Sequence, residues 1–239
     1  ASALASKGQR VLVVDLDPQG NASTALGIDH HADIKSIYEV LIDDVPIEQV
    51  VQVSTESPGV TCVPATIHLA GAEIELVSLV AREQRLRTAI ENYLKTTASP
   101  PDFVLIDCPP SLGLLTVNAF VAAKEVLIPI QCEYYALEGL SQLVGSIEMI
   151  KKHLNPSLEL STILLTMYDT RTKLASQVAD EVKTHFPSQV LSTIIPRSVR
   201  VSEAPSYGKT VISYDRSSPG AIAYLEAAIE IANRGAARG

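Results

Sequence analysis

The sequence predicts an α/β fold with a doubly wound, mostly parallel sheet and helices on both faces. Short runs rich in Val, Ile and Leu alternate along the chain with longer segments of helical periodicity. Most of the short runs lack polar alternation, as expected for strands that are covered on both faces. With 239 residues, 46% of them hydrophobic and 19% charged, the chain can bury a core of this kind.

The elements follow from these patterns in order. Residues 1–8 are expected to form the last turns of a helix that stops at Gly8. Strands are expected at residues 11–15, 60–64, 103–107, 125–130, 161–167, 190–195 and 210–213. Helices are expected at residues 72–94, 112–122, 137–153, 174–185 and 219–233, with short helices near 34–42 and 47–51. No repeat or low-complexity linker interrupts the sequence, so residues 1–239 are interpreted as a single domain.

The most informative local signal is the pair Asp15 and Asp17 at the end of the first expected strand. Alternation along a strand puts the two carboxylates on the same side. Pro18 ends the strand, and Gly20 turns the chain. Open α/β sheets bind ligands beyond the carboxyl ends of their strands, and two like charges this close favour a compensating cation or hydrogen-bond donors. The alternative is a turn with aspartate caps.

Another expected strand ends in Asp107, within the run Phe-Val-Leu-Ile-Asp-Cys-Pro-Pro-Ser. Four apolar residues followed by an acid match the Walker B pattern, in which the acid orients Mg²⁺ and its waters beside phosphates. The pattern alone is common at strand ends. Together with the aspartate pair of the first strand, it predicts a phosphate and metal site.

Two segments that follow late strands carry basic and apolar residues on the ligand-facing edge. Met167 and Pro196 can offer an apolar surface to a base ring. Four basic residues can contact phosphates, namely Arg171, Arg197, Arg200 and Lys209. The alternative places Met167 in the core and pairs the arginines with Asp169 and Glu203.

Charge is distributed unevenly along the chain. Residues 1–149 contain 8 Lys/Arg and 19 Asp/Glu, a net charge of −11, whereas residues 150–239 contain 11 and 8, a net charge of +3. A basic C-terminal region on an acidic body can bind nucleic acid; a solvated mixed surface is the other interpretation. The three cysteines lack metal-ligand spacing and fit reduced thiols of a cytosolic protein. No apolar run reaches transmembrane length.

Taken together, four motifs resemble the ParA/Soj chromosome-partitioning ATPases, which belong to the deviant Walker A class of P-loop ATPases. The motifs are DLDPQGNAST at 15–24, DCPPS at 107–111, PIQCEYYALEG at 129–139 and IPRSVRVSEAPSYGK at 195–209. The resemblance runs from the first residue to about Asn233 and implies a P-loop NTPase-like fold.

This resemblance also implies residue roles. Asp17 would position the attacking water, Asp15 would support its loop and the metal shell, and Asp107 would be the Walker B acid that binds Mg²⁺. The adenine of ATP would lie against Met167, Pro196 and Arg197. Sequence-independent DNA binding would involve Arg171 and Arg200, with Lys209 a weaker candidate.

The same resemblance implies a cytoplasmic, nucleoid-associated homodimer that forms around two ATP molecules and binds double-stranded DNA. A ParB-type partner would stimulate hydrolysis and release the DNA. The family's Lys-Gly-Gly-Val-Gly-Lys-Thr-Thr loop would precede Ala1, so we expect a chain truncated at its N-terminus. Without that loop, we expect it to bind nucleotide poorly and to hydrolyse almost none.

Three alternatives stay open. A MinD-like positioning ATPase would need an amphipathic basic helix at the C-terminus to bind a membrane, and residues 230–239 have few bulky apolar side chains. A non-catalytic DNA-binding scaffold would need no phosphate loop. A reductase similar to the nitrogenase iron protein would need cluster cysteines, and Cys108 and Cys132 lie in other motif contexts.

Overall fold

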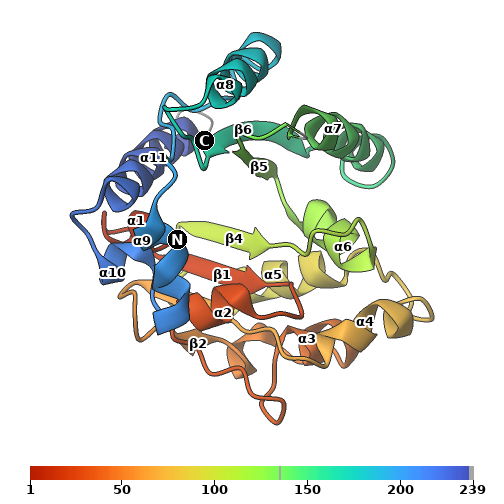
Figure 1. Ribbon diagram of the computed structural model, residues 1–239. Coiled ribbons are helices and arrows are strands. Elements are labelled where there is room, and N and C mark those ends of the chain that lie inside the picture. Colours follow the sequence, from red (N-terminus) through yellow and green to blue (C-terminus); the bar gives the residue numbers. More distant parts are fainter. Residues whose placement is uncertain (135, 237–239) are drawn as a thin grey trace. The chain divides into compact units, whose positions relative to one another are not determined.

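The computed structural model describes residues 1–134 and 136–236, which divide into two compact units (Figure 1). Unit 1 contains residues 1–123 and 204–213, and unit 2 contains residues 124–203 and those from 214 onward. Both units combine parallel strands with helices, so the predicted α/β class is confirmed. Within the described residues, no helix is both long and apolar enough to cross a membrane.

Unit 1 is built on a four-stranded sheet with the order β2 (Gln52–Val53), β3 (Val60–Val63), β1 (Val11–Asp15) and β4 (Phe103–Asp107). Strand β1 lies between β3 and β4 and is parallel to both, whereas the short β2 is antiparallel to β3. Figure 1 shows β1 beside β4. Every residue of β1 is buried. The register places Asp15 opposite Asp107, so neighbouring parallel strands end in the two acids that the sequence singled out.

Helices and short 3₁₀ turns accompany the sheet of unit 1. They are α1 (Ser2–Ala5), α2 (Asn21–Ala25), α3 (Ile37–Ile42), η1 (Ile47–Gln49), α4 (Leu69–Leu76), α5 (Arg85–Thr96), α6 (Leu114–Ala122) and η2 (Ala204–Tyr207). Helix α1 gives way to a turn that ends at Gly8, whose φ of +87° favours glycine, as predicted. The core is mostly aliphatic and includes fully buried Leu12, Leu16 and Leu41.

The single helix expected over residues 72–94 is wrong, because α4 and α5 are separate helices. The segment between them folds into turns. The Arg82 guanidinium donates to the carbonyl of Val77 at 2.8 Å, and the Asn118 amide donates to the carbonyl of Arg82 at 2.8 Å. Side chains therefore satisfy carbonyls that a continuous helix would have paired, and apolar periodicity gives no sign of this.

Unit 2 contains the parallel pair β5 (Glu125–Gln131) and β6 (Glu159–Thr166). Its helices are α7 (Ala136–His153), α8 (Lys173–His185), α9 (Val199–Glu203) and α11 (Pro219–Ala236), and α10 (Val211–Tyr214) contains residues of both units. A small cluster of buried side chains from β6, the 191–195 segment and α11 includes Leu164, Leu191 and Ala223. The strand expected at 210–213 is wrong, because most of that run forms α10. A short apolar run does not by itself separate strand from helix.

The strand expected at residues 190–195 is only partly present. The segment follows β6 through two isolated parallel bridges, Ile163 with Val190 and Tyr168 with Pro196. Between these bridges, the backbone N–H groups of Ser192 and Thr193 donate to the Glu230 carboxylate at 2.8 and 3.1 Å. A side chain of α11 thus replaces a neighbouring strand as the hydrogen-bond partner, which interrupts the regular ladder.

Arg234, one turn further along α11, holds the start of the same segment. Its guanidinium donates to the carbonyls of Ser188 at 3.3 Å, Gln189 at 2.8 Å and Val190 at 2.9 Å, and also to Glu230 at 3.1 Å. Glu230 and Arg234 together therefore fix both the N–H and the C=O groups of a segment that leads to Pro196 and Arg197.

We predict that Arg234→Lys lowers the free energy of unfolding of unit 2 by about 1–2 kcal/mol, because one ammonium group cannot reach three carbonyls in the fixed geometry of a guanidinium. Chemical denaturation monitored by circular dichroism measures the effect. Arg216→Lys, at an exposed position, is the matched control and should be nearly neutral. Equal effects of the two substitutions would contradict the role assigned to Arg234.

Candidate functional site

Asp15 at the end of β1 is a fully buried carboxylate. Ser23 of α2 donates to its Oδ2 twice, from the backbone N–H at 2.8 Å and from Oγ at 2.7 Å. The N–H of Asp17 donates to Oδ1 at 3.3 Å. Burial raises the pKa of Asp15, and the hydrogen bonds from Ser23 oppose that rise. Asp15 therefore fixes the loop between β1 and α2 and is largely occupied by protein donors.

Asp17 lies on this loop, at a half-buried position. Its Oδ1 accepts the N–H of Gln19 at 3.0 Å, and its carbonyl accepts the N–H of Gly20 at 2.9 Å. Gly20 has a φ of +65°, and a Cβ there would lie 3.0 Å from Nδ1 of His30. Both the left-handed backbone and the nearby imidazole favour glycine at position 20, in the turn that carries Asp17.

Asp107 ends β4 beside Asp15, and the carbonyl of Asp107 accepts the N–H of Leu16 at 2.8 Å. Although its side chain reaches solvent, the surrounding protein restricts hydration, and the charges of Asp15 and Asp17 add to this effect. Together they raise the pKa of Asp107 to about 6. The three acids form a locally negative strand end, as the motifs predicted.

The donor set at this strand end fits Mg²⁺, which prefers oxygen ligands and usually keeps several of its waters. Asp107 provides a solvent-accessible carboxylate, whereas the oxygens of Asp15 are taken up by Ser23 and Asp17. Among the described residues, no group of three or more His, Cys, Asp or Glu side chains is placed to hold a metal ion. A metal ion here would thus complete its shell with water or phosphate.

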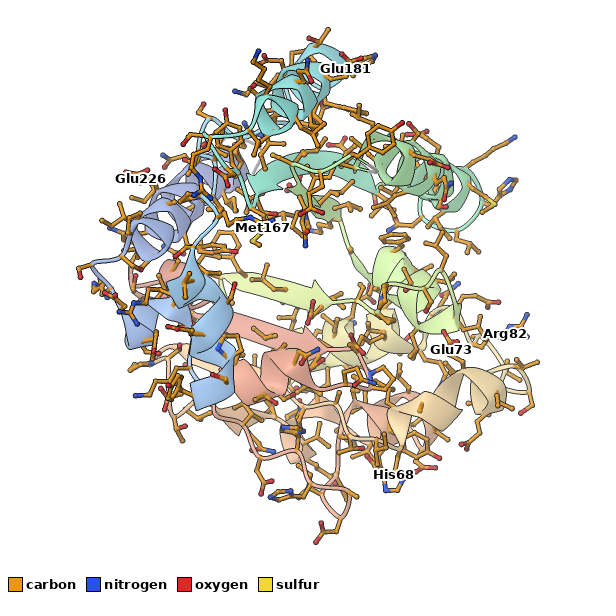
Figure 2. The ribbon with its side chains drawn as sticks, in the orientation of Figure 1. His68, Glu73, Arg82, Met167, Glu181 and Glu226 are labelled. Carbon is orange, nitrogen blue, oxygen red and sulfur yellow. The ribbon has the colours of Figure 1, made fainter. Side chains whose placement is uncertain are left out.

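The segment that leads from Asp107 to α6 is anchored at its far end. Oγ1 of Thr116 donates to the carbonyl of Ser111 at 2.6 Å, and the N–H of Leu115 donates to the Glu73 carboxylate at 3.4 Å. Glu73 reaches this position from α4 (Figure 2). A Cβ at Gly113 would overlap that carboxylate, so a larger residue there would displace the Glu73 side chain from this contact.

In unit 2, Met167 directly follows β6 and is half-buried, with a φ of +53° (Figure 2). The next residue, Tyr168, donates its N–H to Ile195 at 3.1 Å, and its carbonyl accepts the N–H of Arg197 at 2.9 Å. The structure therefore brings Met167, Pro196 and Arg197 onto adjacent segments. Met167 is not a core residue, in contrast to the alternative interpretation of its role.

The three arginines of this unit that the sequence singled out are paired with acids, as that same alternative stated, although not always with the acids that it named. Arg171 binds Asp169 in a fork, with Nε to Oδ1 at 2.9 Å and Nη2 to Oδ2 at 2.7 Å. These contacts hold the pKa of Asp169 well below its usual range. Arg197 pairs with Glu133 at 3.0 Å, a partner that the sequence did not reveal.

Arg200 on α9 has two acidic partners, Glu203 at 3.1 Å and Asp215 at 3.5 Å. Its guanidinium carbon also lies 6.0 Å from the centre of the Tyr214 ring, within range of a cation–π contact. Helix α9 packs closely on α11 at Gly220. A Cβ at this glycine would lie only 2.5 Å from Cγ2 of Val201. This packing fixes the helix that carries Arg200.

Lys209 belongs to unit 1, where its N–H donates to the carbonyl of Ala204 at 3.1 Å. It is therefore not brought together with Arg171 and Arg200 inside one unit. Sequence reasoning also missed two further partners, Ser23 for Asp15 and Asp215 for Arg200. A serine near the start of a helix is a modest signal for the first of these, and nothing in the spacing signals the second.

The fold is that of a P-loop nucleotide-binding ATPase. A family model described as "AAA domain" (AAA_31) matches residues 1–160. The structure is similar to cobyrinic acid a,c-diamide synthase from Mycobacterium smegmatis solved with ADP and magnesium, with a TM-score of 0.83, 36% identity and coverage of 100% of this chain and 87% of that one. The fold also matches the cell division ATPase MinD of Pyrococcus furiosus at a TM-score of 0.77 and 24% identity, covering 97% of this chain and 89% of that one.

Curated relatives define the family more narrowly. The chain is 51% identical to the sporulation initiation inhibitor protein Soj of Bacillus subtilis over 233 residues, which are 97% of this chain and 90% of that protein. It is 51% identical to the chromosome partitioning protein ParA of Myxococcus xanthus over 234 residues, 98% of this chain and 81% of that protein. The chain belongs to the ParA/Soj family of chromosome-partitioning ATPases.

We predict that Ser23→Ala lowers the free energy of unfolding by about 1–3 kcal/mol, because it leaves the buried carboxylate of Asp15 short of a donor. Ser99→Ala, at an exposed position, is the control. Both are measured by urea denaturation. A loss no greater than that of the control would show that the Oγ of Ser23 is not needed to stabilise Asp15.

We predict that Asp107→Asn stabilises the metal-free protein at neutral pH. The pKa of Asp107 is about 6 when folded and near its ordinary 3.8 when unfolded, so the folded state binds this proton more tightly and wild-type stability falls as pH rises through this range. Since the side chain is solvent-accessible, we expect a gain of about 1 kcal/mol at pH about 8 and almost none below pH about 4.

Thermal unfolding in EDTA at the two pH values measures the difference. The matched control is Asp102→Asn, since the pKa of Asp102 is lowered by its hydrogen bonds with Arg10 and the sign should reverse. A gain for Asp107→Asn that does not depend on pH would contradict the charge explanation.

Proposed function

We propose that this protein is a DNA-segregation ATPase of the ParA type, in which the two units work as one ATPase domain. It dimerises on ATP, binds nucleoid DNA without sequence preference, and leaves the DNA when a ParB-type partner stimulates hydrolysis. The observation that carries this proposal is 51% identity to Soj and to ParA over nearly the whole chain. The strand-end acids and the exposed arginines are consistent with it.

At the proposed nucleotide site, Mg²⁺ would neutralise the charge that develops on the ATP phosphates. Asp107 would hold this ion through its accessible carboxylate. Asp17 would orient the attacking water from its half-buried position on the loop. Asp15 would act indirectly, by accepting hydrogen bonds from Ser23 and Asp17. These bonds would keep the loop between β1 and α2 in one geometry.

Adenine would lie on the surface formed by Met167 and Pro196, with Arg197 beside it. The hydrogen bonds that Tyr168 makes to Ile195 and Arg197 support this placement, because they keep the two segments in register. The left-handed backbone at Met167 supports it as well, since such strain concentrates at functional positions.

The proposed DNA surface includes Arg171 and Arg200, with Lys209 as a further contact. Both arginine side chains are more than half exposed, as contacts to a phosphate backbone require. In a dimer, two such surfaces bind one duplex, so that DNA affinity depends on the nucleotide that holds the dimer together.

We predict that the protein carrying the family's Lys-Gly-Gly-Val-Gly-Lys-Thr-Thr loop before Ala1 binds duplex DNA tightly with ATP and weakly with ADP or without nucleotide. Binding should be indifferent to sequence and should weaken steeply with salt, because phosphate contacts release counterions. Fluorescence anisotropy over a salt series measures both properties. Equal DNA binding in all three nucleotide states would favour a non-catalytic scaffold. A protein that does not bind DNA but binds lipid vesicles in the presence of ATP would instead favour a MinD-like ATPase.

Two variants separate the steps. Arg171→Ala should weaken DNA binding and make the salt slope shallower by about 0.9 for each phosphate that the protein no longer neutralises. Asp17→Ala should keep ATP-dependent DNA binding but block hydrolysis, so that the protein stays on DNA. An Asp17→Ala protein that still hydrolyses ATP at the wild-type rate would refute the role of Asp17.

A further inference from the structure

Each arginine proposed for DNA binding is occupied by acidic side chains of its own unit. We propose that Asp169, Glu203 and Asp215 compete internally with DNA phosphates and thereby set the DNA affinity of this surface. The inference rests on the proposed function. It adds three acidic residues that set the affinity for DNA by competing with phosphates for the arginines.

The pair of Arg171 and Asp169 shows the competition most directly. Both oxygens of Asp169 accept parallel N–H donors of the guanidinium, at 2.9 and 2.7 Å, and these are the donors that a phosphate would need. The Arg171 side chain is 83% exposed, whereas that of Asp169 is only 17% exposed. The N–H of Arg171 also donates to Oδ1 of Asp169 at 3.0 Å. The carboxylate is therefore the fixed member of the pair, and the guanidinium is the one that can turn toward DNA.

Arg200 is surrounded by two acids. Glu203 lies one turn away on α9 at 3.1 Å, and Asp215 approaches Nε at 3.5 Å. Asp215 is held in turn by the hydroxyl of Ser217, which donates to its Oδ1 at 2.9 Å. The hydroxyl of Tyr214 donates to Glu203 at 3.4 Å. Both carboxylates are thus positioned around the guanidinium by neighbours of their own.

The balance of charge follows from these contacts. Two arginines and three carboxylates give these two clusters a net charge of −1, although residues 150–239 as a whole carry +3. A phosphate that reaches either arginine must displace a carboxylate and remain close to it. Exposed ion pairs are weak and exchange readily in water, so this competition lowers affinity without abolishing binding. A single copy would bind DNA weakly, and two copies on one duplex would bind it well.

The test measures DNA binding by the chain as it stands, without nucleotide, at low salt, with a mixed-sequence fluorescent duplex as the probe. Asp169→Asn and Asp215→Asn should each tighten binding roughly three- to tenfold, since each removes a carboxylate that competes with phosphate for an arginine. Asparagine keeps an oxygen that can accept the local hydrogen bonds. The matched control is Asp180→Asn on α8, the helix that carries Glu181 in Figure 2, which changes the net charge equally at an exposed position.

The decisive comparison repeats Asp169→Asn in an Arg171→Ala background, and Asp215→Asn in an Arg200→Ala background. The gain should vanish in both backgrounds if each carboxylate acts through its arginine. A gain that persists, or one no larger than that of Asp180→Asn, would overturn the inference, since it would reflect net charge alone. The Arg200 series decides the matter if Asp169→Asn fails to fold, as judged by circular dichroism.

Failure of this inference can be distinguished from failure of the proposed function. If Arg171→Ala and Arg200→Ala weaken DNA binding while the carboxylate variants leave it unchanged, only the internal competition is overturned. If neither the wild type nor any variant binds duplex DNA at low salt, and the protein with the phosphate loop does not bind it with ATP, then the DNA-binding function and this inference fall together.

Discussion

The arrangement of the candidate nucleotide site depends on one buried carboxylate, Asp15, and on the donors that Ser23 supplies to it. A charge at the end of a central strand needs hydrogen bonds to offset its loss of hydration. Here those bonds come from the helix that follows the next turn. Satisfying the charge therefore also sets the path of the loop that carries Asp17. The hydrogen bonds that Asp15 needs thus determine where Asp17 lies, beside the strand that ends in Asp107.

Electrostatics organises unit 2 in a different way. The acids at the strand ends of unit 1 repel one another, so they favour an incoming positive charge. The arginines of unit 2 discussed above are each beside an acid, so they bind an incoming anion only by exchanging partners. The ligands proposed above, a nucleotide with its metal and a DNA backbone, would need opposite charges from the protein. The acids of unit 1 form an unbalanced negative cluster that would suit the metal, whereas the arginines of unit 2 form balanced pairs with acids.

Much of this could be predicted from the sequence, because strand-end acids and apolar runs are local signals. The strands that end in Asp15 and Asp107 and the long helices of unit 2 were predicted closely for that reason. The turns between α4 and α5, the interrupted segment near Ser192 and the contact of Arg200 with Asp215 were not. Each depends on a side chain distant in sequence, and Asn118 and Glu230 even take over backbone hydrogen bonds. The spacing of residues along the sequence cannot predict such partners.

The close contact between Gly220 and Val201 has a consequence for how this surface can change during evolution. Because even a methyl group at position 220 would overlap Cγ2 of Val201, a larger side chain there would force Val201 or its helix to shift. The acids around Arg200, in contrast, lie at the surface and can be exchanged without moving any backbone. The charge of this surface can therefore change by single substitutions while α9 keeps its place on α11.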